Sequence, residues 1–142
     1  MDPVKVVVSS SGIMPERKSE WASGYDLCAC LQAESQYINP MSWRLIATGI
    51  KLEIPNGWEA QIRPRSSMTM AGIILPIGTI DSDYRGEIKI MAYNTGSSPF
   101  KIVHGQRIAQ LVFSAVCQPR LVKVEELSNS ERGEGGFGST GR

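Results

Sequence analysis

Short runs of strand-forming residues, each closed by a turn signal, fill this sequence and leave little room for helices. The runs are rich in β-branched, aromatic and alternating residues, and they are Val4–Val8, Tyr25–Leu31, Trp43–Ile54, Trp58–Ile62, Glu87–Tyr93, Phe100–Val103 and Ile108–Val116. The turn signals are Asn39-Pro40, Pro55-Asn56-Gly57, Asn94-Thr95-Gly96 and His104-Gly105, and the second of them predicts a β-hairpin. Short strands with frequent turns predict an all-β subunit, built as a sandwich or a barrel. Only Arg65–Ala71 could form a helical turn or two, so we expect at most one short helix.

Two of the predicted strands also indicate where the core lies. In Glu87–Tyr93 the side chains of Ile88, Ile90 and Ala92 share one face, because successive strand residues point to opposite sides. In Arg107–Val116 both faces are largely apolar, which predicts a strand that is either central or packed against another subunit. Oligomerisation is therefore plausible from the residues alone.

The length and charge of the chain set broad limits on its class. The chain has 142 residues, a usual size for one domain, and a formal net charge of +1. That balance neither favours nor excludes an anionic partner, so any phosphate site must be built locally. No stretch approaches the ~20 apolar residues that span a membrane, and the run Val6–Val8 is too short for a signal peptide. We expect a protein that is cytoplasmic or nuclear and not secreted.

The three cysteines, Cys28, Cys30 and Cys117, argue against a disulfide framework because their number is odd. A metal site would need more ligands than two neighbouring thiols and the single His104 can supply. We therefore expect reduced, packed thiols, and ordinary surface or packing for His104.

The last fifteen residues, 128–142, differ in composition from the rest of the chain. They read SNSERGEGGFGSTGR, with five glycines and one aromatic residue. Such a segment cannot form a core, so one interpretation is a frayed tail. The alternative is an anion-binding loop, since glycine N–H groups can wrap around a phosphate while Arg132, Ser139 and Thr140 add donors. We divide the chain into a β-domain, residues 1–127, and a flexible Gly-rich tail, residues 128–142.

Two further segments carry polar groups between predicted strands. Gly78–Ile88 contains two aspartates, a tyrosine and an arginine; it is either an acidic turn held by an ion pair or a site where a carboxylate base orients water. Ile62–Met68 contains two arginines and two serines. There, Ser66 or Ser67 could cap a helix, or the helix start could bind an anion. The residues alone leave all these alternatives open.

Taken together, five segments resemble the five motifs of the trimeric dUTPases, in the same order and at similar spacing. They are Ala22–Leu27, Pro64–Met68, Gly78–Ile88, Gly105–Leu111 and Arg132–Gly141. The resemblance covers nearly the whole chain, from Ala22 to its end, and five matches in order are far more specific than one.

The resemblance implies a jelly-roll-like β-subunit and a homotrimer with three active sites at subunit junctions. One subunit would supply the motifs around Asp26, Ser66 and Gln110, a second the Asp81 turn, and a third the swapped C-terminal segment with Phe137. The implied activity is Mg²⁺-assisted hydrolysis of dUTP to dUMP and pyrophosphate, which keeps uracil out of DNA and supplies dUMP for dTMP synthesis. The implied partners are this small-molecule substrate and further copies of the chain, with no nucleic acid and no membrane.

The resemblance also implies a role for individual residues. Asp81 resembles the base that holds the attacking water and binds the 3′-hydroxyl, and Tyr84 resembles the residue that packs under the sugar. Backbone groups of Gly78, Ile80 and Lys89 would contact uracil. The residues implied to contact the phosphates or to close over them are Arg65, Ser66, Ser67, Gln110, Arg132, Gly138, Ser139 and Thr140. Phe137 would stack on the base. Asp26 would act on Mg²⁺ indirectly, through water, because the phosphates chelate the ion.

Departures from the family pattern are modest. Ser67 stands where many members have glycine, and Met68 replaces a common leucine. Leu75-Pro76 enters the uracil segment where some members have a polar residue or glycines, so contacts there are expected from the backbone. Two rival interpretations are a dCTP deaminase on the same fold and a non-catalytic dUTP-binding regulator. The Asp81–Tyr84 turn and the Phe137 tail argue against the deaminase, and a water-activating Asp81 argues against a pure regulator.

Overall fold

The computed structural model describes residues 2–136, and nearly all of its regular structure is β. Its strands are β1 (Lys5–Val8), β2 (Tyr25–Cys28), β3 (Ser35–Ile38), β4 (Ser42–Ala47), β5 (Ile50–Glu53), β6 (Trp58–Pro64), β7 (Ile73–Ile74), β8 (Gly78–Ile80), β9 (Lys89–Asn94), β10 (Phe100–Val103) and β11 (Arg107–Ala115). One short helix, α1 (Ser66–Met70), follows β6 within the described residues. The predicted all-β class with at most one short helix is confirmed. No helix among residues 2–136 is long and apolar enough to cross a membrane.

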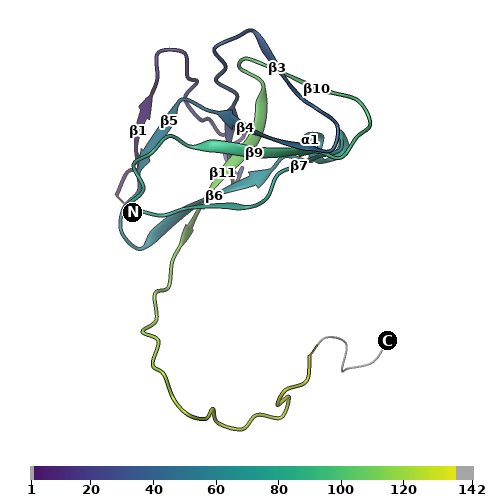
Figure 1. Cartoon of the computed structure of the whole chain (residues 1–142). Helices are drawn as coiled ribbons and strands as arrows, with labels where there is room; N and C mark the ends of the chain where they lie inside the picture. Colours follow the sequence, from purple (N-terminus) through teal and green to yellow (C-terminus); the bar gives the residue numbers. More distant parts are fainter. Residues whose placement is uncertain (1, 137–142) are drawn as a thin grey trace.

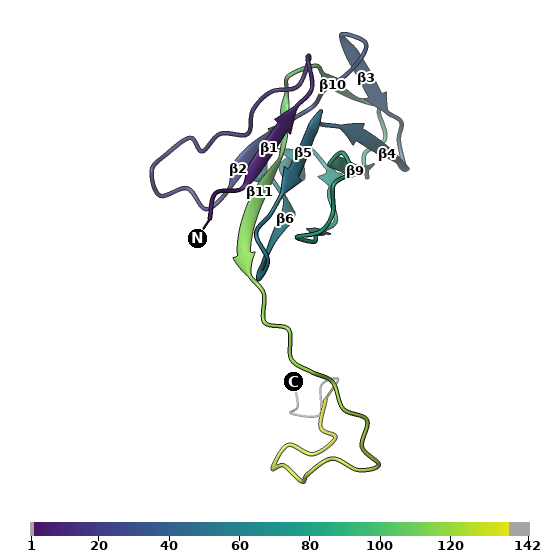
Figure 2. The same cartoon turned by 90° about the vertical axis from the view of Figure 1, so that its left-hand side faces the viewer.

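The strands form packed sheets in which every pairing is antiparallel (Figure 1). One sheet has the order β2-β11-β6-β8, and a second has the order β4-β9-β7. Two smaller sheets pair β1 with β5 and β3 with β10. Figure 2 shows the β1–β5 pair lying over the sheet that contains β11 and β6. Most neighbours in these sheets are distant in sequence, so the fold depends on long-range pairing.

β11 is a central strand, which is the first of the two alternatives predicted for this apolar segment. β11 lies between β2 and β6, and Ile108, Ala109 and Leu111 are all at most 1% exposed, although successive residues point to opposite faces. The predicted alternation around β9 is also confirmed, because Ile88, Ile90 and Ala92 are buried while Lys89 and Met91 are exposed. The core therefore takes side chains from all four sheets, including Ile38 and Leu52 of the two smaller ones.

The predicted strand Trp43–Ile54 is wrong in its continuity, because the chain breaks between β4 and β5. Gly49 has a φ of 68°, a left-handed conformation that a strand does not contain. The buried Thr48 hydroxyl donates to the backbone oxygen of Ile88 at 2.6 Å and fixes the break. As a result, β4 pairs with β9 whereas β5 pairs with β1, so the chain changes sheets here.

The β-hairpin predicted at Pro55-Asn56-Gly57 is also wrong, although a turn does form there. The backbone N–H of Trp58 donates to the oxygen of Pro55 at 3.2 Å. The flanking strands do not pair with each other: β5 pairs with β1, while β6 pairs with β11 and β8. A turn depends on adjacent residues, whereas the strand partner is decided by distant ones.

Other differences concern short or irregular strands. The sequence pattern does not reveal β3, β7 or β8, each of which has at most four residues. The predicted strand Tyr25–Leu31 ends at Cys28, because the next N–H groups turn to other partners: that of Ala29 donates to Gln106 and that of Cys30 to Ala47, both at 2.8 Å. These bonds still anchor the segment to the body.

The C-terminal segment leaves the body at the end of β11 (Figure 1). Residues 116–136 contain no helix or strand, and they carry exposed large apolar side chains. These side chains are Leu121, Val122, Val124 and Leu127. The division of the chain at residue 127 stays a prediction.

Asn94, the last residue of β9, is a buried polar group at a crossing of segments. It is 2% exposed, and its side-chain nitrogen donates to the backbone oxygens of Ile38 at 2.9 Å and Ser98 at 2.8 Å. Its side-chain oxygen accepts from the N–H of Gly96 at 2.9 Å. One side chain thus ties β9 to the end of β3 and to the turn before β10.

We predict that Asn94→Ala lowers the free energy of unfolding by at least about 2 kcal/mol, because each buried group left unpaired costs about 1–3 kcal/mol. Denaturant unfolding at a fixed protein concentration measures the change. Asn56→Ala, in the exposed turn before β6, is the matched control and should stay within about 0.5 kcal/mol of the parent protein. Equal stability of the two variants would contradict the role given to Asn94.

Candidate active site

A polar cavity of about 460 Å³ opens where β2, β11 and the end of β6 meet. It brings together four predicted site residues from three separate segments, namely Asp26, Arg65, Ser66 and Gln110. The register explains this convergence, since Gln110 of β11 lies opposite Asp26 of β2 on one side and Arg63 of β6 on the other. Ser67, the next residue of α1, is exposed and does not line the cavity.

Asp26 is the electrostatic centre of this cavity. One carboxylate oxygen lies 3.5 Å from Nε of Arg65, and the other accepts from Nη1 of Arg107 at 3.1 Å. The Asp26 side chain is 15% exposed and that of Arg65 is 23% exposed, so the first pair is partly shielded from water. With Lys18 also on the wall, three cationic side chains face one carboxylate. The cavity therefore has a positive balance that suits an anion.

Gln110 holds two walls of the cavity together. Its side-chain nitrogen donates to the backbone oxygen of Pro64 at 3.0 Å, directly before Arg65. On the other side, a Cβ added at Gly24 would lie 2.5 Å from the Gln110 side-chain oxygen. A side chain at position 24 would therefore displace the Gln110 amide from its contact with Pro64.

The interpretation of Ser66 or Ser67 as a helix cap is wrong. Arg65 occupies the N-cap position with an extended backbone (φ −95°, ψ 142°), and no side chain caps α1. The two serine hydroxyls are therefore not used for capping. They remain free to serve another purpose in the cavity or beside it.

Asp81 lies in a different place, in the turn that follows β8. It lines a second cavity, of about 550 Å³, together with Trp58, Glu59, Ser82 and other residues of the β5–β6 turn and the C-terminal segment. The backbone oxygen of Asp81 accepts from the N–H of Tyr84 at 3.1 Å, which closes the turn. The carboxylate is exposed.

The remaining residues of this turn are held by backbone contacts. The Tyr84 hydroxyl donates to the backbone oxygen of Glu87 at 3.1 Å, and its ring is 47% exposed. Nη1 of Arg85 donates to the backbone oxygen of Ser82 at 2.6 Å. Among residues 2–136, neither Asp83 nor Arg85 forms an ion pair, so the alternative of a structural ion pair in this turn is not observed.

The predicted uracil contacts flank the turn on two strands. Gly78 and Ile80 belong to β8, which pairs with β6, and Lys89 begins β9. Ile80 and Leu75 are 6% and 5% exposed, so their side chains belong to the core. The side chains of Ile80 and Leu75 are thus unavailable to a ligand, and the uracil contacts of the backbone stay a prediction.

Within one chain, the structure does not bring the two groups of residues together. Asp81 and Tyr84 do not line the cavity of Asp26 and Arg65. Arg132 is exposed in the C-terminal segment, where its Nε donates to the backbone oxygen of Gly135 at 2.7 Å. The predicted contacts of Phe137, Gly138, Ser139 and Thr140 fall outside the described residues. We call the Asp26 cavity, where the phosphate contacts are predicted, the phosphate half-site, and the Asp81 turn with Lys89, where the uracil contacts are predicted, the uracil half-site.

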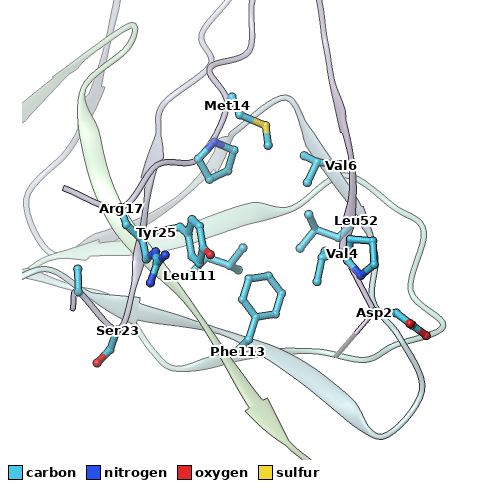
Figure 3. Close-up of a pocket in the computed structure, with 13 residues that line it drawn as sticks. Asp2, Val4, Val6, Met14, Arg17, Ser23, Tyr25, Leu52, Leu111 and Phe113 are labelled. Atoms are coloured by element: carbon cyan, nitrogen blue, oxygen red, sulfur yellow. The ribbon is translucent and has the colours of Figure 1, made fainter. Parts of the chain in front are cut away.

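A third cavity, of about 500 Å³, is mainly apolar and lies between the β1–β5 pair and β11 (Figure 3). Val6, Leu52 and Phe113 point into it from opposite walls, and Tyr25 meets Phe113 edge-on with ring centroids 5.9 Å apart. None of the predicted site residues lines it, and its walls are unsuited to a triphosphate. It is therefore not the candidate active site.

Sequence reasoning missed two charged residues of the phosphate half-site. Arg107 lies in the segment Gly105–Leu111, of which only Gln110 was predicted to be a site residue. Lys18 lies in a loop outside the five matched segments. The contact between Arg107 and Asp26 depends on the pairing of β11 with β2, which is irregular between Arg107 and Ala109. Only the structure reveals that pairing.

All three cysteines are free thiols, but the predicted packing is wrong for Cys117, which is exposed at the start of the C-terminal segment. Cys28, at the end of β2, lies opposite Arg107 in the sheet. Burial raises the pKa of the Cys28 thiol, and the negative charge of Asp26 raises it further. Cys28 is therefore a neutral, structural thiol beside the phosphate half-site.

Comparison with known proteins places this geometry in a family. The sequence profile of the dUTPases matches residues 10–141. The chain belongs to the dUTPase family. It is 50% identical over 131 residues to the deoxyuridine 5'-triphosphate nucleotidohydrolase of Caldanaerobacter subterraneus subsp. tengcongensis, covering 90% of this chain and 88% of that protein. It is 44% identical over 143 residues to the same enzyme of Beijerinckia indica subsp. indica, covering 97% and 89%.

Solved dUTPase structures share the fold. The dUTPase of Staphylococcus bacteriophage 80alpha with dUPNHPP superimposes with a TM-score of 0.92, at 28% identity and with 100% of both chains covered. The dUTPase of phage phi11 of S. aureus, described with a structural Mg(II) ion, has a TM-score of 0.80 at 24% identity, covering 88% of this chain and 98% of that chain. The jelly-roll-like β fold expected of this dUTPase-family chain is thereby confirmed.

We predict that Cys28 reacts with iodoacetamide at least about tenfold more slowly than the exposed Cys117 at pH 8, because the thiolate is the reacting form and its fraction falls as the pKa rises. The ratio should narrow as the pH increases through the raised pKa of Cys28. Mass spectrometry of the alkylated peptides gives both rates. Protein unfolded in urea is the control, in which the two rates should converge; equal rates in the folded protein would contradict the prediction.

Proposed function

We propose that this dUTPase-family chain hydrolyses dUTP to dUMP and pyrophosphate, the reaction that keeps uracil out of DNA and supplies dUMP for dTMP synthesis. The observation that carries the proposal is the convergence of Asp26, Arg65, Ser66 and Gln110, from three matched motifs, in one positively balanced cavity. The names of the curated relatives support it. The analogue bound to the phage 80alpha dUTPase supports a deoxyuridine nucleotide as ligand.

In the proposed mechanism, Asp81 acts as the base. Its exposed carboxylate accepts a hydrogen bond from a water molecule and orients that water in line with the α-phosphorus. The water oxygen forms a bond to the α-phosphorus while the bond from that phosphorus to the bridging oxygen breaks. The proton passes to Asp81, and pyrophosphate leaves with the bond's electron pair. No covalent enzyme intermediate is needed, so positioning and charge compensation carry the catalysis.

The phosphate half-site compensates the charge of the substrate. Arg65 and Ser66 are proposed to bind phosphate oxygens, with Ser67 beside them and Gln110 completing the wall. Arg65 is already oriented by its ion pair with Asp26. A guanidinium held in place loses little freedom on binding a phosphate, which favours charge-assisted, paired hydrogen bonds.

Mg²⁺ fits the chemistry of the residues present. Residues 2–136 contain no group of three or more His, Cys, Asp or Glu side chains that could hold a metal by itself. Mg²⁺ does not need such a cage, because it commonly keeps several waters and binds through one or two carboxylates and substrate phosphates. Asp26 is the residue that would hold its water shell. When bound, the ion supplies charge neutralisation at the phosphates.

The nucleoside is proposed to bind at the uracil half-site. Backbone groups of Gly78, Ile80 and Lys89 would pair with the uracil edge, and the ring of Tyr84 would pack under the deoxyribose. Asp81 would also receive the 3′-hydroxyl. The Tyr84 hydroxyl is tied to Glu87, so the ring has a fixed position from which it can refuse a 2′-hydroxyl. A rigid wall rejects a small added group better than an open pocket does.

The complete site is proposed to form in a homotrimer. Asp26 and Asp81 line separate cavities of one chain, which supports a site completed by a second chain. The exposed apolar segment from Leu121 to Leu127 leaves the body and supports a swap of the C-terminus onto a neighbour. Residues 128–142 would then close over the triphosphate with Arg132, Gly138, Ser139 and Thr140, and Phe137 would stack on the base, a contact worth about 1–3 kcal/mol.

The proposed function is tested by assaying pyrophosphate release from dUTP, dTTP, dCTP and UTP with Mg²⁺, and by the variant Asp81→Asn. We predict a clear preference for dUTP in the parent protein. Asp81→Asn should lower kcat at least about 100-fold, since a positioned base contributes about 10²–10⁴ in rate. Its affinity for dUTP, measured by calorimetry, should change little.

Asp2→Asn is the matched control, because Asp2 is an exposed aspartate that lines neither the Asp81 cavity nor the Asp26 cavity. It should keep kcat within about twofold of the parent value. A parent protein that assembles yet leaves dUTP intact would overturn the proposed function. An active Asp81→Asn variant would contradict the role of Asp81 as the base and leave the proposed function standing.

Sharing of the site between chains gives a separate prediction. Asp81→Asn damages the uracil half-site and Arg65→Ala damages the phosphate half-site, so each variant alone should be nearly inactive. Equal amounts, unfolded and refolded together, should recover about a quarter of the parent activity, the fraction of intact half-site pairs in randomly mixed cyclic trimers. Steady-state assays before and after mixing measure the recovery. No gain on mixing would show that one chain builds the whole site.

A further inference from the structure

Glu87 lies between the Asp81–Tyr84 turn and β9, and its side chain binds the body of the fold. Oε1 of Glu87 accepts from the N–H of Gly49 at 2.9 Å. Glu87 lines neither the Asp81 cavity nor the Asp26 cavity. Its hydrogen bond instead joins the end of the turn to the point where the chain changes sheets.

Gly49 needs an acceptor from outside the sheets. It lies between β4 and β5 with a φ of 68°, and neither strand contains it. A Cβ added at Gly49 would collide with Oγ of Ser9 and lie 3.1 Å from Sγ of Cys30, so the backbone here is closely surrounded. A carboxylate is a strong acceptor, because charge-assisted hydrogen bonds are stronger than neutral ones. Glu87 therefore stabilises a backbone conformation that the sheets leave unpaired.

Two backbone oxygens complete the connection. The N–H of Ile88 donates to the oxygen of Ile50 at 2.8 Å, and the hydroxyl of Thr48 donates to the oxygen of Ile88 at 2.6 Å. We call these two hydrogen bonds and the bond from Gly49 to Glu87 the Glu87 clamp. Of the three, the bond from Gly49 alone depends on the Glu87 side chain. The clamp fixes where the turn is attached to the body.

The backbone of Glu87 in turn fixes Tyr84. Its oxygen accepts from the Tyr84 hydroxyl at 3.1 Å. The phenol lies against Gly86, since a Cβ added there would collide with the hydroxyl and the ring of Tyr84. Tyr84 is 47% exposed, so these contacts and not burial in the core decide the position of the ring. A shift of the peptide of Glu87 would therefore move the ring.

We propose that Glu87 is a positioning residue that sets the sugar specificity of the uracil half-site. By accepting from Gly49 it holds the peptide that binds the Tyr84 hydroxyl, and so it keeps the ring where a ribose 2′-hydroxyl would collide. The inference rests on the proposed function, in which Tyr84 packs under the deoxyribose. A wall excludes a small added group only when it cannot move away, so loss of the carboxylate favours UTP.

The variants Glu87→Ala and Glu87→Gln test the inference, because glutamine keeps a side-chain oxygen that can accept from Gly49. The ratio of kcat/KM for dUTP to kcat/KM for UTP should fall at least about fivefold in Glu87→Ala, with kcat/KM for UTP rising, and should stay within about twofold of the parent value in Glu87→Gln. A purely structural loss would lower both substrates by the same factor. A smaller fall in Glu87→Ala, or an equal fall in Glu87→Gln, would overturn the inference.

Glu34→Ala is the matched control, because Glu34 is an exposed glutamate that lines neither the Asp81 cavity nor the Asp26 cavity. It should keep the parent ratio. If Glu87→Ala does not fold, Glu87→Met takes its place, since methionine keeps the length of the side chain and has only a weak acceptor.

A double variant shows whether Glu87 acts through Tyr84. Tyr84→Phe removes the hydroxyl that binds the oxygen of Glu87 and should also lower the ratio. The combination Glu87→Ala/Tyr84→Phe should lower it no further than the larger single effect, because residues that act through one contact are not additive. Multiplied effects would contradict this route.

Amide hydrogen exchange tests the clamp without any assay of turnover. In Glu87→Ala the Gly49 N–H should exchange at least about tenfold faster than in the parent protein, because its acceptor is gone. The N–H of Cys30, which donates to the oxygen of Ala47 at 2.8 Å, is the internal reference and should be unchanged. Equal exchange of Gly49 in both proteins would overturn the clamp. A parent protein that leaves dUTP intact would instead overturn the proposed function, whereas an active parent with an unchanged ratio in Glu87→Ala overturns this inference alone.

Discussion

The pairing of β11 with two strands at once is the constraint on which the site depends. β11 lies between β2 and β6, and its two faces are both buried, so it cannot shift by one residue without exposing a full set of apolar side chains. This fixed register places Gln110 between Asp26 and Arg63. The three motifs that form the phosphate half-site meet because of it, although they are separated by tens of residues in sequence.

The carboxylate of Asp26 organises the same region by charge. It forms ion pairs with Arg65 and Arg107, which arrive from different elements of the fold. Two guanidinium groups near each other repel, and a carboxylate between them reduces that cost. A water-mediated role toward Mg²⁺ and this role toward the arginines are compatible, because a carboxylate has about four lone-pair positions. Asp26 thus holds two guanidinium groups at the wall of one cavity.

The fold class and four residues that line the Asp26 cavity could be predicted from the sequence, whereas the strand partners and the ion pairs could not. Alternation gave the buried residues around β9 correctly, since it depends on neighbouring positions only. Distant strands decide both the break at Gly49 and the partners of β5 and β6. The local pattern at Pro55-Asn56-Gly57 therefore predicted a hairpin that does not form. Asp26, Arg65, Ser66 and Gln110 were found through motif resemblance, but Arg107 was missed because its importance lies in one contact across β2. The roles of Asp81, Tyr84 and the C-terminal residues stay predictions, because each role is defined by a proposed contact with the substrate or with another copy of the chain.

The side chains of Trp43, Leu45 and Met91 leave an apolar surface exposed on the sheet β4-β9-β7 of a single chain. A folded single chain carries this apolar surface into a crowded solution, where such a surface promotes aggregation. Burying it on assembly would make resistance to unfolding rise with the abundance of the protein. At low concentration the chains would then be less stable and inactive. The cellular concentration of the protein would therefore set how much active enzyme is present.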